Sequence, residues 1–199
     1  MAQSRYVAPA YNGPKVPYRD SAPPAVAPFY SNLGSTACTG CNYDTSNGLL
    51  VIGPANCFAS GATQWAAVPF IAGKSGQVRK VQVAVTLDSA LCSNGANKFQ
   101  VAIYSDACAG PAALLGGPVT VTAPAAPCGL ATANFGTTGP ALTAGTEYWV
   151  VAETAANQTK FTGVWWQSYH ELTSFNLNDG NGWLYPATYG PNDLAMSVQ

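Results

Sequence analysis

Short runs of alternating apolar and polar residues dominate this chain. In residues 78–87, every second residue from Val81 onward is apolar, and most residues between them are polar or small. A period of two is typical of a strand with one buried face. Asn94-Gly95 then predicts a turn, and residues 99–104 alternate again with their odd-numbered side chains inward. We therefore expect these two segments to form an antiparallel hairpin.

Further segments have the β-branched and aromatic composition of strands. They are residues 49–52, 63–71, 119–121, 131–135, 147–153, 161–166 and 194–198. Pro69 predicts an edge or bulge position in its strand. No segment shows a sustained helical period. About eight to ten short strands predict an all-β fold, an antiparallel β-sandwich or jelly roll, over residues 35–199.

Residues 1–34 differ from the rest of the chain. They hold six of the fifteen prolines, and their net charge is +2 while the remainder carries −3. Proline at this density favours an extended polyproline II backbone. A flexible tail is the plain interpretation of such a terminus. We instead expect an extended arm that binds other protein subunits through its aromatic rings. These partner-binding candidates are Tyr6, Tyr11, Tyr18, Phe29 and Tyr30.

Charged residues make up only 9% of the chain, and its net charge is −1. Binding to phosphate backbones needs clustered Lys and Arg, so we expect no nucleic-acid partner. Hydrophobic residues make up 48% of the chain, which is enough to fill a core and argues against disorder throughout. No apolar run reaches the length of about 18 residues that a membrane span needs, so we expect no membrane partner.

The cysteine content points to an oxidising final environment, since an even number in a loop-rich β chain favours disulfides. The six candidates are Cys38, Cys41, Cys57, Cys92, Cys108 and Cys128. Residues 1–20 nevertheless lack the apolar stretch of a secretory signal. Three explanations fit. A signal was removed, or the protein oxidises after joining a released particle, or the cysteines stay reduced and pack as small apolar groups.

Strand spacing restricts the cysteine pairing. The strand between Cys92 and Cys108 separates them by about 20 Å, whereas bridged Cα atoms lie within about 7 Å. Cys92 with Cys128 is more plausible, because two strand passages return the chain to the same end. We expect Cys57 to pair with a cysteine of the nearby Cys38-x-x-Cys41 motif. The cysteines left over are candidates for bonds between molecules.

Candidate catalytic and metal-binding residues are few. His170 is the single histidine, and without a Gly-x-Ser-x-Gly elbow a surface histidine is favoured over a triad. The Cys38-x-x-Cys41 motif is half a zinc site without a second half. Residues 176–182 are oxygen-rich but hold one carboxylate, which favours a plain turn over a calcium loop. Glu147 and Glu153 lie about 20 Å apart on one strand, too far for a glycosidase pair. We expect no enzyme, cofactor or metal.

Aromatic residues gather toward the C-terminal end of the chain. Trp165 and Trp166 are adjacent on one expected strand and must face opposite ways, so one is core and the other is exposed or covered by a partner. Core packing and interface anchors are the favoured roles for this group. Trp183 and Tyr185 are the candidate glycan-binding residues, because exposed rings can stack on sugar faces.

Three segments carry a resemblance to known modules. They are Lys80-Val81-Gln82-Val83, residues 99–106 followed by Gly110-Pro111, and residues 142–151. This pattern, over about residues 60–199, resembles β-sandwich modules of exported bacterial surface proteins and of phage virion proteins of the decoration or fibre type. The resemblance implies a binding or structural module rather than an enzyme.

Two functions follow as expectations. The first is a non-enzymatic structural protein of a larger assembly, a phage virion decoration, cement or fibre-type protein. It would be a homo-oligomer, or bind a coat protein, through its N-terminal arm, and its location would be the virion. The alternative is a secreted carbohydrate-binding or adhesive β-sandwich module, located extracellularly or at a cell surface.

Overall fold

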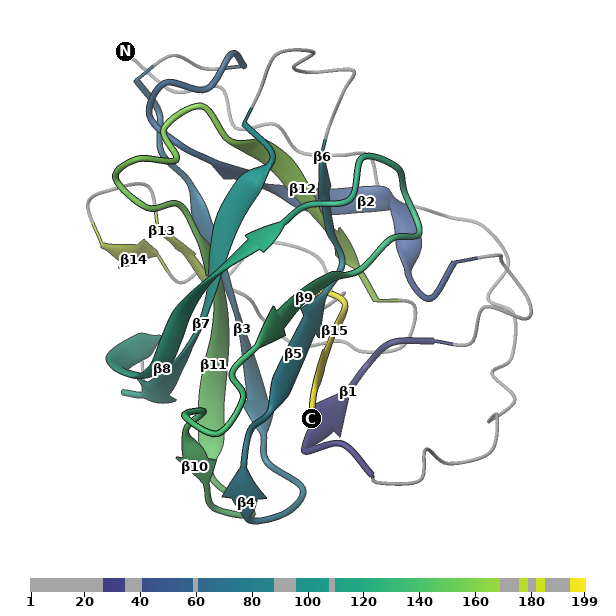
Figure 1. The fold of residues 1–199 in the computed structure, drawn as a ribbon, viewed down its shortest axis with the longest axis vertical. Helices are drawn as coiled ribbons and strands as arrows, with labels where there is room; N and C mark the ends of the chain where they lie inside the picture. The colour runs from purple at the N-terminus through teal and green to yellow at the C-terminus, as the bar shows by residue number, and fades with distance from the viewer. Residues whose placement is uncertain are drawn as a thin grey trace.

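The computed structural model describes residues 27–34, 41–58, 61–87, 96–107, 110–168, 176–178, 182–184 and 194–199. Within these ranges the chain forms fifteen β-strands and no helix, and every pair of named strands is antiparallel (Figure 1). No helix in this described part could therefore span a membrane. The all-β prediction is confirmed, with more strands than expected because several span only two or three residues. Jelly-roll connectivity stays a prediction.

One layer of the molecule is a six-stranded sheet in the order β14-β13-β3-β11-β7-β8. Its strands are β3 (Trp65–Ile71), β7 (Lys98–Asp106), β8 (Pro111–Thr122), β11 (Glu147–Glu153), β13 (Asn176–Asn178) and β14 (Trp183–Leu184). Alternation along β7 sends Phe99, Val101 and Ile103 into the core, as the sequence predicts. Gly145, at a φ of 77°, lies in the turn that leads into β11.

The facing layer contains two smaller sheets. The first is ordered β1 (Tyr30–Ser31), β15 (Met196–Val198), β5 (Lys80–Val83) and β9 (Ala131–Asn134), and the second β2 (Asp44–Ile52), β12 (Thr162–Gln167) and β6 (Val85–Leu87). They meet at Ala84, whose N–H donates to the Ala195 carbonyl and whose carbonyl accepts from the Trp166 N–H, each at 3.0 Å. A short pair, β4 (Gly76–Gln77) with β10 (Ala141–Leu142), lies at one end (Figure 1).

A single large apolar core fills the space between the layers. It brings Val68 and Val150 of the six-stranded sheet together with Val81 and Met196 of the facing layer. Two antiparallel layers packed over one core form a sandwich-like arrangement. The core therefore fixes which face of the six-stranded sheet is buried and which points outward.

Two sequence predictions about strand pairing have different outcomes. The expected hairpin between residues 78–87 and 99–104 is wrong. β5 pairs with β9 and β15, β6 pairs with β12, and β7 pairs with β8 and β11. Alternation identifies a strand and its buried face but not its neighbour in the sheet. Pro69 fits its expected edge position, because β13 pairs with β3 only over residues 65–67, and Pro69 lies beyond them.

The root of the arm, residues 27–34, is built into the body. Phe29 is only 5% exposed, and the Tyr30 ring lies 5.7 Å from the Phe70 ring, centroid to centroid. Tyr30 also pairs with Val198 across β1 and β15. Phe29 and Tyr30, which the sequence analysis assigned to a partner interface, therefore serve their own core. The folded body includes residues that the sequence analysis placed in the arm.

Asn32 links this root to the C-terminal strand. Its buried side-chain amide donates to the Leu194 carbonyl at 3.1 Å, and its Oδ1 accepts from the Met196 N–H at 2.7 Å. Its own carbonyl accepts from the Ser168 hydroxyl at 2.7 Å. One buried amide thus bonds to two backbone groups at the start of the C-terminal strand.

Replacing this amide tests the link. Asn32→Ala removes the acceptor of the buried Met196 N–H and one donor to the Leu194 carbonyl, so we expect the free energy of unfolding to fall by about 2–4 kcal/mol. Urea denaturation measures it. Ser31→Ala is the matched control, because Ser31 is exposed and adjacent, and it should change stability by less than about 0.5 kcal/mol. Equal effects of the two variants would contradict the role given to Asn32.

Candidate functional site

The face of the six-stranded sheet that points away from the main core gathers aromatic and acidic side chains. Alternation places on this side the residues of β3, β7 and β11 that do not enter the main core. We call this surface the outer face. It comprises Trp65, Ala67, Pro69 and Ile71 of β3, Gln100, Ala102, Tyr104 and Asp106 of β7, and Glu147, Trp149, Val151 and Glu153 of β11.

A small apolar cluster occupies the centre of the outer face. Its members are Ala67, Trp149 and Val151, with Tyr104 and Trp183 packed against them. Trp149 is only 3% exposed, and its indole N–H donates to Asp106 Oδ1 at 2.9 Å. Trp183, the glycan-binding candidate from the sequence, is half-buried against this cluster. The central rings therefore act mainly as packing.

Buried Glu153 and half-buried Tyr104 form a polar pair next to this cluster. The Tyr104 hydroxyl donates to Glu153 Oε2 at 3.2 Å. Burial raises the pKa of Glu153, and the hydrogen bond from Tyr104 partly offsets that rise. Burial, reinforced by the Glu153 carboxylate, raises the pKa of Tyr104 to about 12. Trp65 nearby donates its indole N–H to the Thr154 hydroxyl at 3.0 Å. The Tyr104 hydroxyl and the Trp65 indole N–H thus already have hydrogen-bond acceptors within the protein.

Glu147 and Glu153 lie on the same face at opposite ends of β11, as the sequence predicts. Glu147 is exposed, and partial desolvation followed by the nearby Asp106 charge raises its pKa. Glu153 instead contacts Tyr104. Each acid has a different neighbour, so the two do not face each other across a substrate. The close pair Asp106 and Glu147 was not recognised from the sequence, because its members come from different strands.

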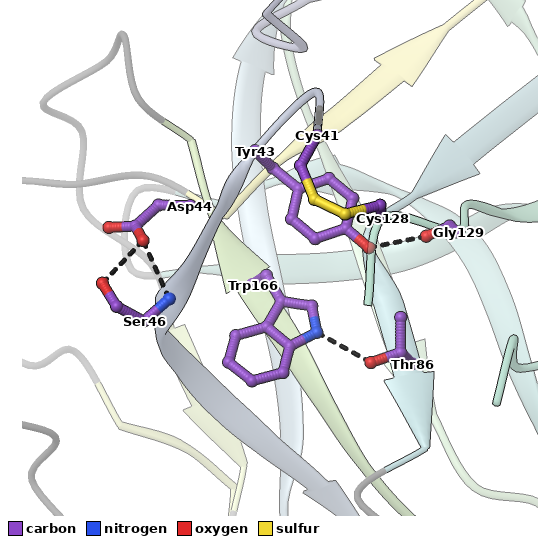
Figure 2. Close-up of a disulfide and its surroundings, with 8 residues drawn as sticks. All are labelled: Cys41, Tyr43, Asp44, Ser46, Thr86, Cys128, Gly129 and Trp166. Carbon is purple, nitrogen blue, oxygen red and sulfur yellow. Dashed lines mark hydrogen bonds between the residues drawn. A yellow bond between two sulfur atoms is a disulfide. The ribbon is translucent and has the colours of Figure 1, made fainter. Parts of the chain in front are cut away.

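A disulfide joins Cys41, just before β2, to Cys128, in the connection between β8 and β9 (Figure 2). Their Cα atoms lie 4.7 Å apart across a sequence separation of 87. Tyr43 strengthens the same connection, because its hydroxyl donates to the Gly129 carbonyl at 2.7 Å. Burial raises the pKa of Tyr43 to about 12. The segment after the root is therefore tied to the loop that joins the two layers.

This pairing corrects two expectations. Cys128 is bonded to Cys41, so the favoured Cys92–Cys128 pair is wrong, and so is a bond between Cys57 and Cys41. Cys57 is also disulfide-bonded. Counting strand passages failed because Cys128 lies in an irregular loop, where Cys128 itself has a φ of 74°. Cys41 is no free thiolate, so the Cys38-x-x-Cys41 motif does not supply two zinc ligands.

The two adjacent tryptophans behave as predicted. Trp165 is fully buried and donates its indole N–H to the Ala195 carbonyl at 3.0 Å. Trp166 faces the other way, is half-buried, and donates to the Thr86 hydroxyl at 2.7 Å (Figure 2). Trp166 also packs against the main core. Its own molecule therefore covers part of it.

Other residues singled out from the sequence lie outside the described ranges. They are Tyr6, Tyr11, Tyr18, Cys38, Cys92, Cys108, His170 and Tyr185, together with residues 179–181 of the oxygen-rich loop. Among the described residues, no group of three or more His, Cys, Asp or Glu side chains could hold a metal ion.

The fold and the outer face define an all-β, sandwich-like domain with at least one disulfide. No protein-family model and no curated protein matches the chain. Its function must therefore be argued from its own geometry.

Removal of the disulfide tests its contribution. For Cys41→Ala/Cys128→Ala we expect the free energy of unfolding to fall by about 2–5 kcal/mol, because the bond closes a long loop in the unfolded chain. Chemical denaturation measures the change. Tyr43→Phe is the control, since it removes only the hydroxyl contact and should cost about 1 kcal/mol. A non-reducing peptide map that joins Cys128 to any cysteine other than Cys41 would overturn the assignment.

The buried Glu153 predicts a pH-dependent stability. The pKa of Glu153 is raised in the folded protein. Its contribution to the free energy of unfolding is therefore fully present below the ordinary pKa of 4.5 and is lost as the pH rises through the raised pKa. Glu153→Gln removes the charge and keeps an acceptor for Tyr104. We expect this variant to melt at a higher temperature than the wild type at pH 8 and at a similar temperature at pH 4.

Tyr104→Phe provides the complementary measurement. It removes the hydroxyl that donates to the carboxylate, so it should lower the melting temperature more at pH 8 than at pH 4. Scanning calorimetry at both pH values measures both variants. A melting difference between Glu153→Gln and the wild type that is the same at pH 4 and pH 8 would refute the role of this carboxyl.

Proposed function

We propose that this chain is a non-enzymatic structural protein of a larger assembly, of the virion decoration, cement or fibre type. In this proposal an extended N-terminal arm binds a neighbouring subunit and the sandwich serves as a rigid body. The observation that carries it is the attachment of the arm's root, where Asn32 and β1 pair with the C-terminal strand. A binding arm must be fixed to its body if it is to transmit force.

The attachment suits mechanical work in two ways. Backbone bonds join the root to β15, with the Phe29 N–H donating to the Val198 carbonyl at 2.8 Å and the Asn32 N–H donating to the Met196 carbonyl at 3.1 Å. A few residues later, Cys41 is covalently joined to Cys128. Tension on the arm is thus shared between a ladder of hydrogen bonds and a covalent bond. Disulfides persist in oxidising surroundings, which fits a virion or an extracellular location.

The sugar-binding alternative has less support. Sugar-binding surfaces need exposed ring faces and polar atoms that are free to bind hydroxyl groups. The indole N–H of Trp149 already bonds to Asp106, that of Trp65 to Thr154, and Trp183 is partly covered. The structural role therefore remains our proposal.

Truncation of the arm tests this function. Deletion of residues 1–26 spares Phe29 and Asn32, so we expect a folded body with an unchanged circular-dichroism spectrum. We expect the deletion to abolish co-sedimentation with the native assembly, because the binding segment is gone. Deletion through residue 34 is the contrasting variant, since it also removes buried Phe29 and Asn32 and should destabilise the body. Retained co-sedimentation of the shorter deletion would reject the proposal.

A further inference from the structure

One end of the outer face combines exposed apolar and acidic side chains. Ile71, at the end of β3, is 62% exposed and pairs with Glu147, the first residue of β11. Tyr148 pairs with Ser105, so Glu147 lies beside Asp106 on the neighbouring strand β7, and the Asp106 charge contributes to the raised pKa of Glu147. Leu114 of β8 is 48% exposed and pairs with Tyr104, one row further along the sheet. We call Ile71, Asp106, Leu114 and Glu147 the acidic rim.

The acidic rim holds two carboxylates, because Asp106 and Glu147 lie on the same side of adjacent strands, where like charges repel one another. It also exposes Ile71 and Leu114, whose strands β3 and β8 have β11 and β7 between them in the sheet. A partner that carries both basic and apolar side chains fits this combination of groups.

The root of the arm leaves the body at this same end. The Gly73 N–H donates to the Phe29 carbonyl at 2.8 Å, and Lys74 donates its ammonium proton to the Ala27 carbonyl. Gly73 follows Ile71 by two residues, and the Ala72 N–H donates to the carbonyl of Thr146 at 3.1 Å, directly before Glu147. Figure 1 shows β1 and the ends of β3 and β11 toward the lower part of the molecule. The chain before Ala27 therefore starts close to the acidic rim.

The leading part of the arm, residues 1–26, has the complementary chemistry. It contains Arg5, Lys15 and Arg19 against the single acid Asp20. Its prolines and tyrosines favour an extended backbone that presents apolar rings, the kind of segment that aromatic surfaces bind. Its charge of +2 is opposite in sign to that of the rim carboxylates.

We propose that the leading part of the arm of one copy binds the acidic rim of a second copy. This inference rests on the proposed function, because it names the partner of the arm as another copy of the chain. Binding between copies is favoured over binding within one, since the root lies beside its own rim. In an extended backbone at about 3.1 Å per residue, Arg19 reaches about 25 Å and Lys15 about 37 Å beyond Ala27. This reach is long enough for the basic side chains to contact the rim of a neighbour.

Two complementary charge variants of the full chain test the inference. The first is the arm variant, Arg5→Glu/Lys15→Glu/Arg19→Glu, which keeps the rim intact. The second is the rim variant, Glu147→Lys, which keeps the arm intact and spares Asp106, the acceptor for Trp149. Glu147 is exposed at the start of β11, so this variant should fold normally. Lys160→Glu, an exposed charge reversal outside the outer face, is the control.

Sedimentation velocity at low ionic strength measures self-association. We expect the wild type and the control to self-associate, and we expect added salt to weaken this self-association. Each charge variant alone should associate at least about tenfold more weakly, a loss of about 1.4 kcal/mol. An equimolar mixture of the two variants should regain association, because the intact arm of the rim variant fits the intact rim of the arm variant.

Three outcomes would overturn the inference. They are a wild type that stays monomeric, variants that associate like the wild type, and a mixture of the two variants that regains no association. The proposed function is judged separately by deletion of residues 1–26. If that deletion abolishes co-sedimentation while Glu147→Lys changes neither self-association nor co-sedimentation, the arm binds a different protein. The function then stands and this inference fails.

Discussion

The body depends on the junction between its first and last described strands. Asn32 occupies a buried position, where its side-chain amide donates to the Leu194 carbonyl and accepts from the Met196 N–H. An unpaired buried backbone group costs more than an ordinary hydrogen bond provides, so this amide decides whether the C-terminal strand can stay in its sheet. That strand in turn pairs with β5, whose Val81 and Val83 line the core.

Much of the architecture could be predicted from the sequence. The sequence predicted β7 and β11 closely, because β7 alternates and β11 is a short apolar run that is buried on both faces. Adjacency alone required Trp165 and Trp166 to face opposite ways. Pairing could not be predicted the same way. Residues 78–87 form two strands that change sheets at Ala84, and no local pattern reports the partners of β5 and β6. The Cys41–Cys128 bond could not be predicted either, because it joins two loops that are distant in the sequence.

The candidate site was predicted less well than the fold. Phe29 resembled the other aromatic residues of the arm, and only the structure shows that it is buried. The outer face could have been found in part, since Trp149 and Glu153 share the parity that points away from the core on β11. Its acidic rim could not, because Asp106 and Glu147 become neighbours only when β7 and β11 pair. The composition did not indicate the acidic rim either, since the net charge of the whole chain is only −1.

The pairing of β1 with β15 joins the first and last strands of the described body. Chain ends usually fray first, because each can detach without disturbing the rest. Here neither end is independent, since loss of Tyr30 from the edge removes the partner of Val198, and loss of β15 removes both β1 and one neighbour of β5. The two ends should therefore be protected from amide hydrogen exchange together, and should open as one cooperative unit with the centre of the sandwich.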